Sequence, residues 1–338
     1  MGKHSKTKEE VNNKKSKKNS KHIGRKILIV IVLLLAIAGG LFAKRVYDLN
    51  GNWLAALMGH NKETVNKLEK LYILVMGEST GMSDTIIVTS YDPKTGEASM
   101  LSIPRDTFIG ESKSRATTSD KINALYNGGA KPEKTMEAVN KLTGLNIKNY
   151  ILVDTKALVE LVDTIGGLEF EVPMDMKYDD DSQDLHVNLK EGKQKLSGDQ
   201  VEQLVRFRHN SNGSTYSYEY GIEDFGRMKT QRAVMVAIAK QTIKFKNVKE
   251  IGHMIDISKK YVKTNMDLNI LKNYIPYIME MDTEAIKTEQ LPGQAQYING
   301  ISFFLADDDE TKEVVDELFF GKPKTEDDKT EENNINND

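Results

Sequence analysis

Short apolar runs bounded by Gly, Pro and Asp mark the beginning of the globular part of the chain. The runs Leu71–Met76, Thr85–Thr89 and Ala98–Ile103 contain many β-branched residues and end in turn-forming or charged residues. Such runs are typical of buried strands, the first ending at a glycine. The turn residues Tyr91–Gly96 between the last two runs predict a hairpin. A further element begins at Lys121–Tyr126.

Helical periodicity alternates with further apolar runs in the rest of the chain. We expect helices at Pro132–Leu142, Lys156–Ile165, Ser197–Leu204, Phe225–Phe245 and Asp267–Met281, and strands at Asn149–Asp154 and Leu168–Val172. Gly144 follows the first helix, and a capping-box pattern opens the third. This alternation of strands and helices predicts an α/β domain with a covered sheet.

The longest apolar run, Ile27–Ala43, has about 17 residues, the lower limit for a helix that crosses a bilayer. Lys26 before it and Lys44–Arg45 behind it can extend their charged ends to the membrane surface. A cleaved signal peptide is the alternative, but Ala36–Ala38, which resembles a cleavage site, lies inside the run. The pattern therefore favours an uncleaved transmembrane anchor.

Charge is distributed unevenly around this predicted anchor. Ten Lys or Arg residues and two Glu residues precede Ile27, whereas the remainder is net acidic. The positive-inside rule then places the amino terminus in the cytoplasm and the bulk of the protein outside, where no ATP is available. We expect a disordered basic tail at 1–26, the anchor at 27–43, a stalk at 44–70, an extracellular domain at 71–321 and a disordered acidic tail at 322–338.

Composition excludes several kinds of site. The chain has no Cys, which excludes disulfides, thiolate metal sites and a Cys nucleophile and is compatible with a Gram-positive cell surface. Its six His residues lack the spacing of a zinc site, and there is no nucleophile elbow or P-loop. The acidic triplets Asp179–Asp181 and Asp307–Asp309 lack the EF-hand pattern and are expected in solvated loops. Nucleic-acid binding would need a basic folded part, so no nucleic-acid partner is expected.

Carboxylates and an arginine gather at the predicted strand ends. Asp84, Arg105 and Asp106 lie beside strand termini, where side chains can converge on one edge of a sheet, and Glu78 follows the first strand. Carboxylates next to basic groups suit Mg²⁺ bound to phosphate oxygens, with Asp84 and Asp106 as the best ligands and Glu78 as a third. Strand-end Asp residues that make turns are the alternative interpretation.

A second polar cluster contains several arginines. Arg206 and Arg208 flank Phe207, and an extended backbone would direct both guanidinium groups to one side with Phe207 pointing inward. Arg227 and Gln231 would lie one turn apart on the next helix. The planar guanidinium group matches phosphate, so the cluster predicts a site for a di- or triphosphate. A solvated basic face is the alternative.

Taken in order, these segments resemble the LytR-CpsA-Psr family over roughly residues 71–240. The resemblance is carried by Ser83–Thr85, Ser102–Thr107, Lys121–Asn123, Leu161–Gly167, Arg206–Arg208 and Asp224–Arg227. It implies a central mixed β-sheet flanked by helices, with an apolar channel for a lipid. It also implies a membrane-anchored cell-wall enzyme that moves an anionic glycopolymer from a polyprenyl-pyrophosphate carrier onto peptidoglycan, with Mg²⁺ on the pyrophosphate.

The resemblance also implies roles for individual residues. Asp84 and Asp106 fall on the metal-associated carboxylates; Asp106 is also a candidate for the group that takes the proton of the attacking hydroxyl. Pyrophosphate binding falls on Arg105, Arg206, Arg208, Arg227 and Gln231, and Lys121 falls on a nearby basic position. The chain departs from the family pattern at Ser79, where many members have Asp, and at Met82, where they have Arg.

Three hypotheses remain for the biochemical function. The first is a transferase that forms a phosphodiester by in-line attack of a peptidoglycan sugar hydroxyl, stabilised by a positive cradle. The second is a membrane-anchored binding or regulatory protein that holds a polyprenyl phosphate without turnover, which Met82 would fit. The third is a pyrophosphatase that uses the same cradle with water as the nucleophile. The metal and phosphate positions favour the transferase.

Overall fold

The structure, a computed structural model, describes residues 35–79, 82–126, 131–244, 256–257 and 259–322. The chain forms two compact units, residues 1–67 and 68–338. The predicted basic tail 1–26, residues 27–34 of the predicted anchor and residues 323–338 of the predicted acidic tail lie outside the described residues.

The described part of the first unit is helical. Residues 35–48, which include the described part of the predicted anchor, form a helix that α2 (Trp53–Leu57) and α3 (Lys62–Lys67) follow. The Asn52 side chain caps α2 by accepting a hydrogen bond from the backbone N–H of Ala55 at 2.8 Å. Among the helices that the structure describes, none has the length and apolar character needed to cross a membrane.

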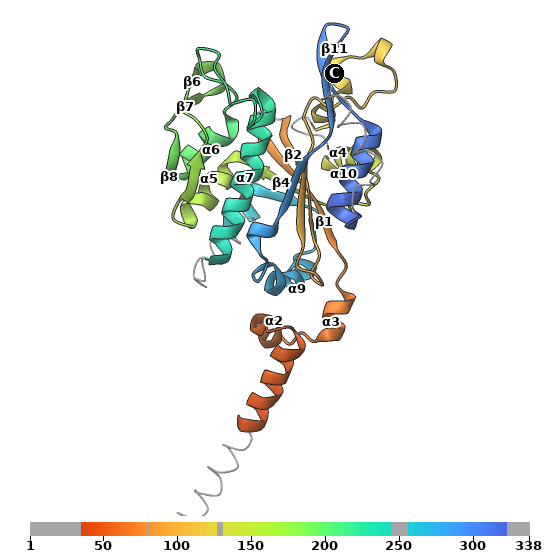
Figure 1. Cartoon of the computed structure of the whole chain (residues 1–338), viewed down its shortest axis with the longest axis vertical. Coiled ribbons are helices and arrows are strands. Elements are labelled where there is room, and N and C mark those ends of the chain that lie inside the picture. The colour runs from red at the N-terminus through yellow and green to blue at the C-terminus, as the bar shows by residue number, and fades with distance from the viewer. Residues whose placement is uncertain (1–34, 80–81, 127–130, 245–255, 258, 323–338) are drawn as a thin grey trace, which may run out of the picture. The chain divides into compact units, whose positions relative to one another are not determined.

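A mixed sheet forms the centre of the second unit (Figure 1). Within the described residues it has six strands in the order β10–β3–β2–β1–β4–β9. These strands are β1 (Leu71–Ser79), β2 (Met82–Tyr91), β3 (Ala98–Ser102), β4 (Asn149–Asp154), β9 (Val262–Thr264) and β10 (Lys287–Gln290). β2 is antiparallel to both β1 and β3, whereas β4 runs parallel to β1. The predicted strands, the hairpin and the central mixed sheet are confirmed.

The first strand is longer than its apolar run. β1 does not stop at Gly77, because pairing with β2 continues through an irregularity between Gly77 and Glu78 to Ser79. A Cβ at Gly77 would lie 3.1 Å from the Thr85 Cβ on β2, so the two backbones approach closely here. The strand extension places Glu78 beside the end of β4, where its register partner is Asp154.

Helices cover both sides of the sheet (Figure 1). They are α4 (Pro132–Thr143), α5 (Thr155–Thr164), α6 (Gly198–Arg206), α7 (Glu223–Lys244), α9 (Leu268–Ile278) and α10 (Asp308–Phe320). Single 3₁₀ turns lie at Lys113–Arg115, Thr118–Asp120, Ile122–Leu125, Asp181–Gln183 and Thr283–Ala285. The predicted capping box at Ser197 and the left-handed Gly144 after α4 are both present. All five predicted helices form, with ends shifted by a few residues.

Two hydrophobic cores lie on opposite sides of the sheet. The first joins β1, β2 and β3 to α4 and α10, with Leu74, Val139 and Phe319 nearly fully buried. The second joins α5, α6 and α7 to two small antiparallel sheets, β5–β8 and β6–β7. Their strands are β5 (Leu168–Val172), β6 (Met176–Asp180), β7 (Leu185–Leu189) and β8 (Gly192–Leu196). The second core thus forms a separate layer that faces the sheet.

The remaining described strands form a hairpin, β11 (Gly293–Ile298) and β12 (Ile301–Ala306). β12 continues into α10, whose cap is Asp307: its side chain accepts a hydrogen bond from the Glu310 N–H. Asp308 and Asp309 occupy the first turn of this helix, where carboxylates offset the helix dipole. The prediction of a loop at Asp307–Asp309 is therefore wrong, although the three side chains are exposed as predicted. It is also wrong for Asp179–Asp181, because Asp179 and Asp180 end β6 and Asp181 begins a 3₁₀ turn.

Candidate active site

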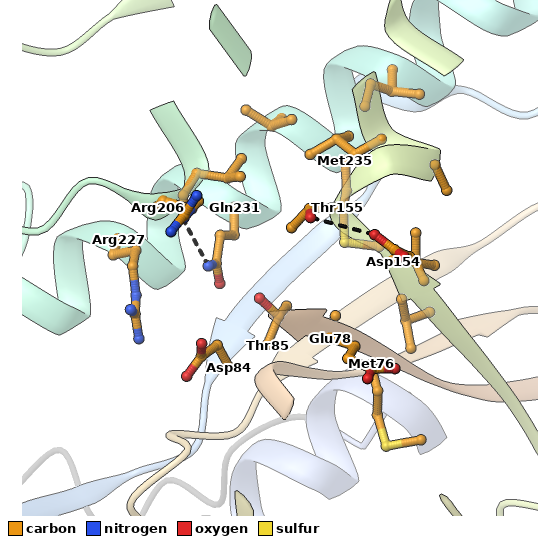
Figure 2. A pocket seen from close by; sticks show the side chains of 18 of the residues that line it. Met76, Glu78, Asp84, Thr85, Asp154, Thr155, Arg206, Arg227, Gln231 and Met235 are labelled. Carbon is orange, nitrogen blue, oxygen red and sulfur yellow. Dashed lines mark hydrogen bonds between the residues drawn. The ribbon is translucent and has the colours of Figure 1, made fainter. Parts of the chain in front are cut away.

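A cavity of about 590 Å³ lies between the sheet and the layer formed by α5, α6 and α7. Its sheet side includes Val75 and Thr85, and its helical side includes Leu158 and Met235. One part of the lining is charged, and another part is apolar. Figure 2 shows Arg227 and Gln231 of α7 across from Asp84 and Thr85 of β2.

The sheet supplies an ion pair to the charged part. Arg105, just after β3, donates through Nη1 to the Asp84 carboxylate at 2.5 Å, and both side chains are about one-quarter exposed. Burial alone would lower the pKa of Arg105, but Asp84, Asp224 and Asp106 raise it above its ordinary value. The guanidinium group is therefore held in its charged form at the cavity wall.

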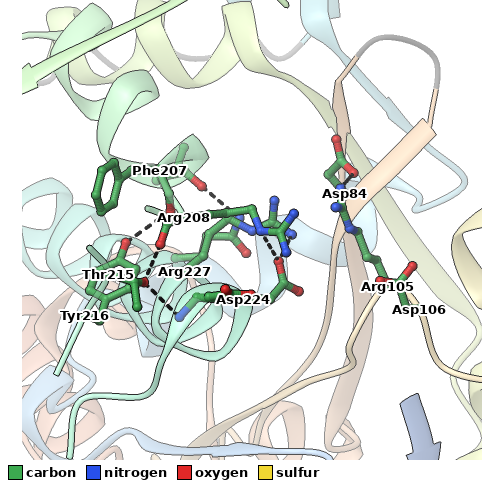
Figure 3. Close-up of polar contacts among 12 residues, drawn as sticks. Asp84, Arg105, Asp106, Phe207, Arg208, Thr215, Tyr216, Asp224 and Arg227 are labelled. Carbon is green, nitrogen blue, oxygen red and sulfur yellow. Dashed lines mark hydrogen bonds and ion pairs between the residues drawn. The ribbon is translucent and has the colours of Figure 1, made fainter. Parts of the chain in front are cut away.

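Arg208 and Arg227 converge on Asp224 (Figure 3). Arg227 Nη2 lies 2.6 Å and Arg208 Nε 3.3 Å from the same carboxylate oxygen of Asp224. Arg227 is only 5% exposed, and burial lowers its pKa although Asp224 offsets part of this effect. An arginine keeps its proton at physiological pH, so the cation remains.

Several guanidinium donors around Asp224 lack a hydrogen-bond partner. Among the described residues, the buried Nε atoms of Arg105, Arg208 and Arg227 make no hydrogen bond, and the contact of Arg227 Nη2 with Asp224 is an ion pair without hydrogen-bond geometry. Unpaired buried donors are costly and rare. Three guanidinium groups face the two carboxylates of Asp84 and Asp224, so this part of the cavity has an excess positive charge and spare donors for an anion.

Arg206 and Gln231 also line the cavity, but both are partly committed to protein partners. Arg206 donates to Glu202 at 3.1 Å and to the Gln183 carbonyl at 2.9 Å. Gln231 donates to the Val205 carbonyl at 3.0 Å.

The local backbone agrees only in part with the predicted arrangement. Arg227 and Gln231 lie on one face of a helix, as predicted. The predicted extended segment is wrong for Arg206, because Arg206 is the last residue of α6 and the extended backbone begins at Phe207. Phe207 points inward as predicted and is 1% exposed.

Asp106 and Lys121 pair with each other outside the cavity lining. The Lys121 ammonium lies 2.9 Å from the Asp106 carboxylate, and it also lies over the Phe303 ring. The structure therefore separates the predicted residues into six that line the cavity and two that lie beside it. The six are Asp84, Arg105, Arg206, Arg208, Arg227 and Gln231.

The predicted magnesium ligands fit the ion only in part. Within the described residues, no three His, Asp or Glu side chains are grouped closely enough to hold a metal by themselves. Mg²⁺ is usually held by one or two carboxylates together with phosphate oxygens and water, so the set around Asp84 still fits an ion completed by a bound pyrophosphate. Glu78, the third candidate, lines the cavity and accepts a hydrogen bond from the Tyr126 hydroxyl at 2.7 Å.

The apolar part of the cavity is lined by the sheet on one side and by the helical layer on the other. Its lining includes Val75 on β1, Leu161 on α5, Leu185 on β7, Val205 on α6 and Ile238 on α7. A ligand held with its anionic group at the arginines can therefore place an apolar chain between sheet and helices. Burial of such a chain contributes about 0.8 kcal/mol per CH₂ group.

Three residues of the site are not evident from the sequence. Asp224 organises two arginines, but an Asp at a helix start is equally typical of a cap, so its sequence position alone does not indicate this contact. Tyr178 and His209 also line the cavity. They are brought to it by the β6–β7 hairpin and the loop after α6, and neither element has a periodicity that predicts its position.

Comparisons with known proteins show a family and a fold that this chain shares. The sequence profile of the LytR_cpsA_psr family matches residues 5–319. A polyisoprenyl-teichoic acid–peptidoglycan teichoic acid transferase TagU of Oceanobacillus iheyensis is 26% identical over 312 residues, which cover 86% of this chain and 91% of that protein. The biofilm regulatory protein A of Streptococcus mutans is also 26% identical, over 84% of this chain and 73% of its own length. The crystal structure of TagV from B. subtilis aligns with a TM-score of 0.60 and 26% identity, over 76% of this chain and all of that chain.

Proposed function

Because the chain belongs to the LytR_cpsA_psr family, we propose that it is a transferase that moves an anionic glycopolymer from a polyprenyl-pyrophosphate carrier onto peptidoglycan. Its TagU relatives are named for such a transfer of teichoic acid. The acceptor is a sugar hydroxyl, and the product is a phosphodiester. The polymer is a teichoic acid or a capsule-like polysaccharide.

The observation that carries this proposal is a single cavity with both kinds of lining. Arg105, Arg208 and Arg227 form the cationic part, and the walls from β1, α5 and α7 form the apolar part. A polyprenyl pyrophosphate has the same division into a doubly anionic head and an apolar tail. A planar guanidinium group can donate two parallel hydrogen bonds to two phosphate oxygens, and it retains its charge when buried.

In the proposed mechanism the arginines bind and orient the pyrophosphate. Arg208 and Arg227 contact it from the helical side, Arg105 contacts it from the sheet side, and Arg206 and Gln231 border the same space. Positive charge placed where negative charge develops lowers the barrier to phosphoryl transfer. A Mg²⁺ ion held by Asp84, with Asp106 nearby, would neutralise pyrophosphate charge when bound. No nucleotide is consumed, because cleavage of the pyrophosphate releases a good leaving group.

Membrane anchoring is part of the proposal. We assign residues 27–43 to a signal anchor, with the basic tail 1–26 in the cytoplasm, residues 44–70 as a stalk and the domain 71–321 on the outer face of the membrane. The apolar composition of the run and the basic residues before it support this topology. The carrier lipid and peptidoglycan would then both be accessible to one site.

The experiment is a transfer assay with the full-length protein in detergent. A glycopolymer labelled on its sugar and linked to polyprenyl pyrophosphate is incubated with peptidoglycan oligosaccharides and Mg²⁺. We expect label on the oligosaccharide and an equal amount of released polyprenyl phosphate. Release of the labelled glycopolymer phosphate into water without oligosaccharide labelling would identify a pyrophosphatase. A bound but unchanged lipid would identify a binding protein.

A further inference from the structure

The cavity contains an acid–base group, His209, that binding of the pyrophosphate does not require. His209 follows Arg208 directly and lines the same cavity. Its ring packs edge-on against Tyr178, with centroids 5.3 Å apart and an angle of 87° between the planes. Tyr178 is in turn held by a hydrogen bond from its hydroxyl to Asp180 at 3.2 Å. The imidazole is therefore oriented by a neighbouring ring and not only by its own backbone.

The hydrogen bonding of His209 fixes which nitrogen carries the proton. Nδ1 lies 3.1 Å from the backbone carbonyl oxygen of Asn210. A carbonyl can only accept, so Nδ1 is the donor, and the neutral ring must have its lone pair on Nε2. Within the described part of the chain, Nε2 has no hydrogen-bond or ion-pair partner. His209 thus offers a free proton acceptor in the cavity that the arginines also line.

The carboxylates around the cavity are all engaged by donors. Asp84 pairs with Arg105, and Asp224 is shared by Arg208 and Arg227. Glu78 accepts the Tyr126 hydroxyl at 2.7 Å, and Asp154 caps α5 by accepting the Lys156 N–H at 2.9 Å. Each of these carboxylates therefore already has a protein donor, whereas Nε2 of His209 has none among the described residues.

Asp106, the base candidate from the sequence, is similarly engaged. It is neutralised by Lys121 at 2.9 Å and lies outside the cavity lining. An imidazole nitrogen with a free lone pair can accept a proton directly, whereas the Asp106 carboxylate is already occupied by the Lys121 ammonium.

We propose that His209 is the general base of the proposed transfer and accepts the proton of the attacking peptidoglycan hydroxyl on Nε2. The hydroxyl oxygen forms a bond to the phosphorus atom that carries the glycopolymer. The bond from that phosphorus to the bridging oxygen breaks, and the bridging oxygen leaves with polyprenyl phosphate. The hydroxyl proton moves to Nε2, so the imidazolium formed balances the negative charge released with the lipid phosphate.

The charged groups around His209 are compatible with this role. The segment of His209 itself carries Arg206 and Arg208, and β6 carries Tyr178 and Asp180. Helix α7 carries Asp224 and Arg227. The sheet side of the site carries Asp84 and Arg105. The arginines disfavour a further positive charge on the His209 ring, and the negative charge of a bound pyrophosphate would offset this repulsion. The imidazolium that forms during transfer therefore gains its counter-charge together with the substrate.

The test uses His209→Asn in the full-length protein, because the Asn amide can still donate to the Asn210 carbonyl but has no counterpart of Nε2. Transfer and binding of polyprenyl pyrophosphate are measured separately between about pH 5.5 and pH 9, values chosen around the range of imidazole titration. We expect kcat to fall by about 100-fold or more, as is typical for loss of a general base, with binding within about twofold. The acidic limb of the wild-type pH–rate profile should disappear.

The matched control is His186→Asn. His186 lies on β7, is more than half exposed, pairs with Asp179 and lies outside the cavity lining, so its replacement should leave kcat and the pH profile unchanged. A second variant, His209→Gln, keeps the size of the side chain and should also lose the acidic limb. Thermal melting of each variant checks folding.

The inference rests on the proposed function, and the outcomes separate the two. If wild-type protein transfers label but His209→Asn keeps the wild-type kcat and acidic limb, the general-base assignment is wrong while the transferase remains. If His209→Asn loses lipid binding together with kcat, His209 is structural and the assignment is again wrong. If wild-type protein labels no oligosaccharide, the transferase proposal fails and the assignment fails with it.

Discussion

Arg227 is the residue that most clearly connects packing to chemistry. It is only 5% exposed on α7, with a carboxylate 2.6 Å from one nitrogen and with donors that have no hydrogen-bond partner among the described residues. A buried guanidinium group is costly when its pairing is incomplete. The local sequence predicts an arginine on a helix, but it does not predict this burial. Arg105 and Asp84, which lie close enough to influence the charge of Arg227, come from the sheet and are more than 100 residues away in the sequence.

Replacement of Arg208 by Lys tests the guanidinium geometry. Lysine keeps the positive charge but loses the planar fork that can contact two phosphate oxygens. Each charge-assisted hydrogen bond contributes about 1.5–3 kcal/mol, so we expect affinity for a short-chain polyprenyl pyrophosphate to fall by about tenfold or more. Arg208→Ala should be weaker still.

Arg115→Lys, at an exposed position outside the cavity, serves as the control for this measurement and should bind normally. Wild-type affinity in Arg208→Lys would mean that the arginines form an ordinary solvated basic face. In that case moderate salt would also remove most of the binding.

Asp84→Ala tests the proposed metal site. Loss of its carboxylate removes a hard oxygen ligand and frees Arg105, so we expect magnesium-dependent transfer to fall by about 100-fold or more while melting changes little. Asp175→Ala, which breaks an exposed pair with Lys190, is the matched control. Magnesium-dependent transfer that persists in a double variant of Asp84 and Asp106 would show that neither carboxylate is needed to hold the metal.

Tyr126 gives a prediction for alkaline pH. Burial, the hydrogen bond to Glu78 and the charge of Glu78 raise its pKa to about 12. The folded state then holds the phenol proton more tightly than the unfolded state, whose pKa is about 10. The free energy of unfolding should therefore be unaffected below about pH 10 and fall between about pH 10 and pH 12, by about 2–3 kcal/mol from this residue.

Urea unfolding of wild-type protein and Tyr126→Phe at about pH 8, 10 and 12 measures this contribution. The variant should lose less stability than wild type across the alkaline part of this range. Tyr91 and Tyr216, whose pKa values are also raised mainly by burial, contribute equally to both proteins and cancel in the comparison. Equal losses in the two proteins would show that the Tyr126–Glu78 contact does not stabilise the fold.

At the scale of elements, the sequence predicts those strands and helices in which apolar residues recur at the spacing of the buried face. β1 to β4 are apolar runs because the sheet is covered on both sides, and α4 to α7 carry caps or apolar faces. β11 is exposed along nearly its whole length, and β9 has only three residues. Neither strand therefore has an alternation of apolar and polar residues by which the sequence could predict it. Tyr178 and His209 likewise depend on weakly patterned segments, which is why their part of the cavity wall is not evident from the sequence.

The start of α7 is a junction that tolerates no added side chain. A Cβ at Gly226 would lie 2.2 Å from the Gly221 carbonyl and 2.2 Å from the Tyr216 ring. Gly226→Ala should therefore destabilise the protein by about 1–3 kcal/mol and displace the helix turn that holds Asp224 and Arg227. Lipid binding should weaken more than stability alone accounts for.

Gly144→Ala is the comparison for this junction. Gly144 has open space around its Cα, but its φ is positive, at 69°. We therefore expect the alanine variant to lose about 1–2 kcal/mol of free energy of unfolding without any loss of lipid affinity. Urea unfolding and lipid binding measured on both variants separate the two effects. Unchanged binding in Gly226→Ala would show that the helix start is not needed to position the arginines.

At the scale of the whole molecule, the charge asymmetry predicts topology. The basic residues before Ile27 should keep the amino terminus in the cytoplasm and place Asp338 outside. Fusion at the carboxyl terminus of a reporter that is active only outside the cytoplasm should give signal, and a reporter active only inside should give none. Reversal of these signals would show that the apolar run does not act as an amino-in anchor.

The last described helix holds the beginning of the folded unit in place. Lys70, immediately before β1, donates to the Phe319 carbonyl at 2.6 Å, and Ser99 of β3 donates to the Leu318 carbonyl at 2.8 Å. β10 completes the sheet beside β3 only near the end of the chain. A polypeptide exported from its amino-terminal end would therefore emerge with its central strands uncovered until α10 has followed. Because these contacts close the fold only when α10 is present, a chain that ends before α10 should be sensitive to proteases and should have no partial activity.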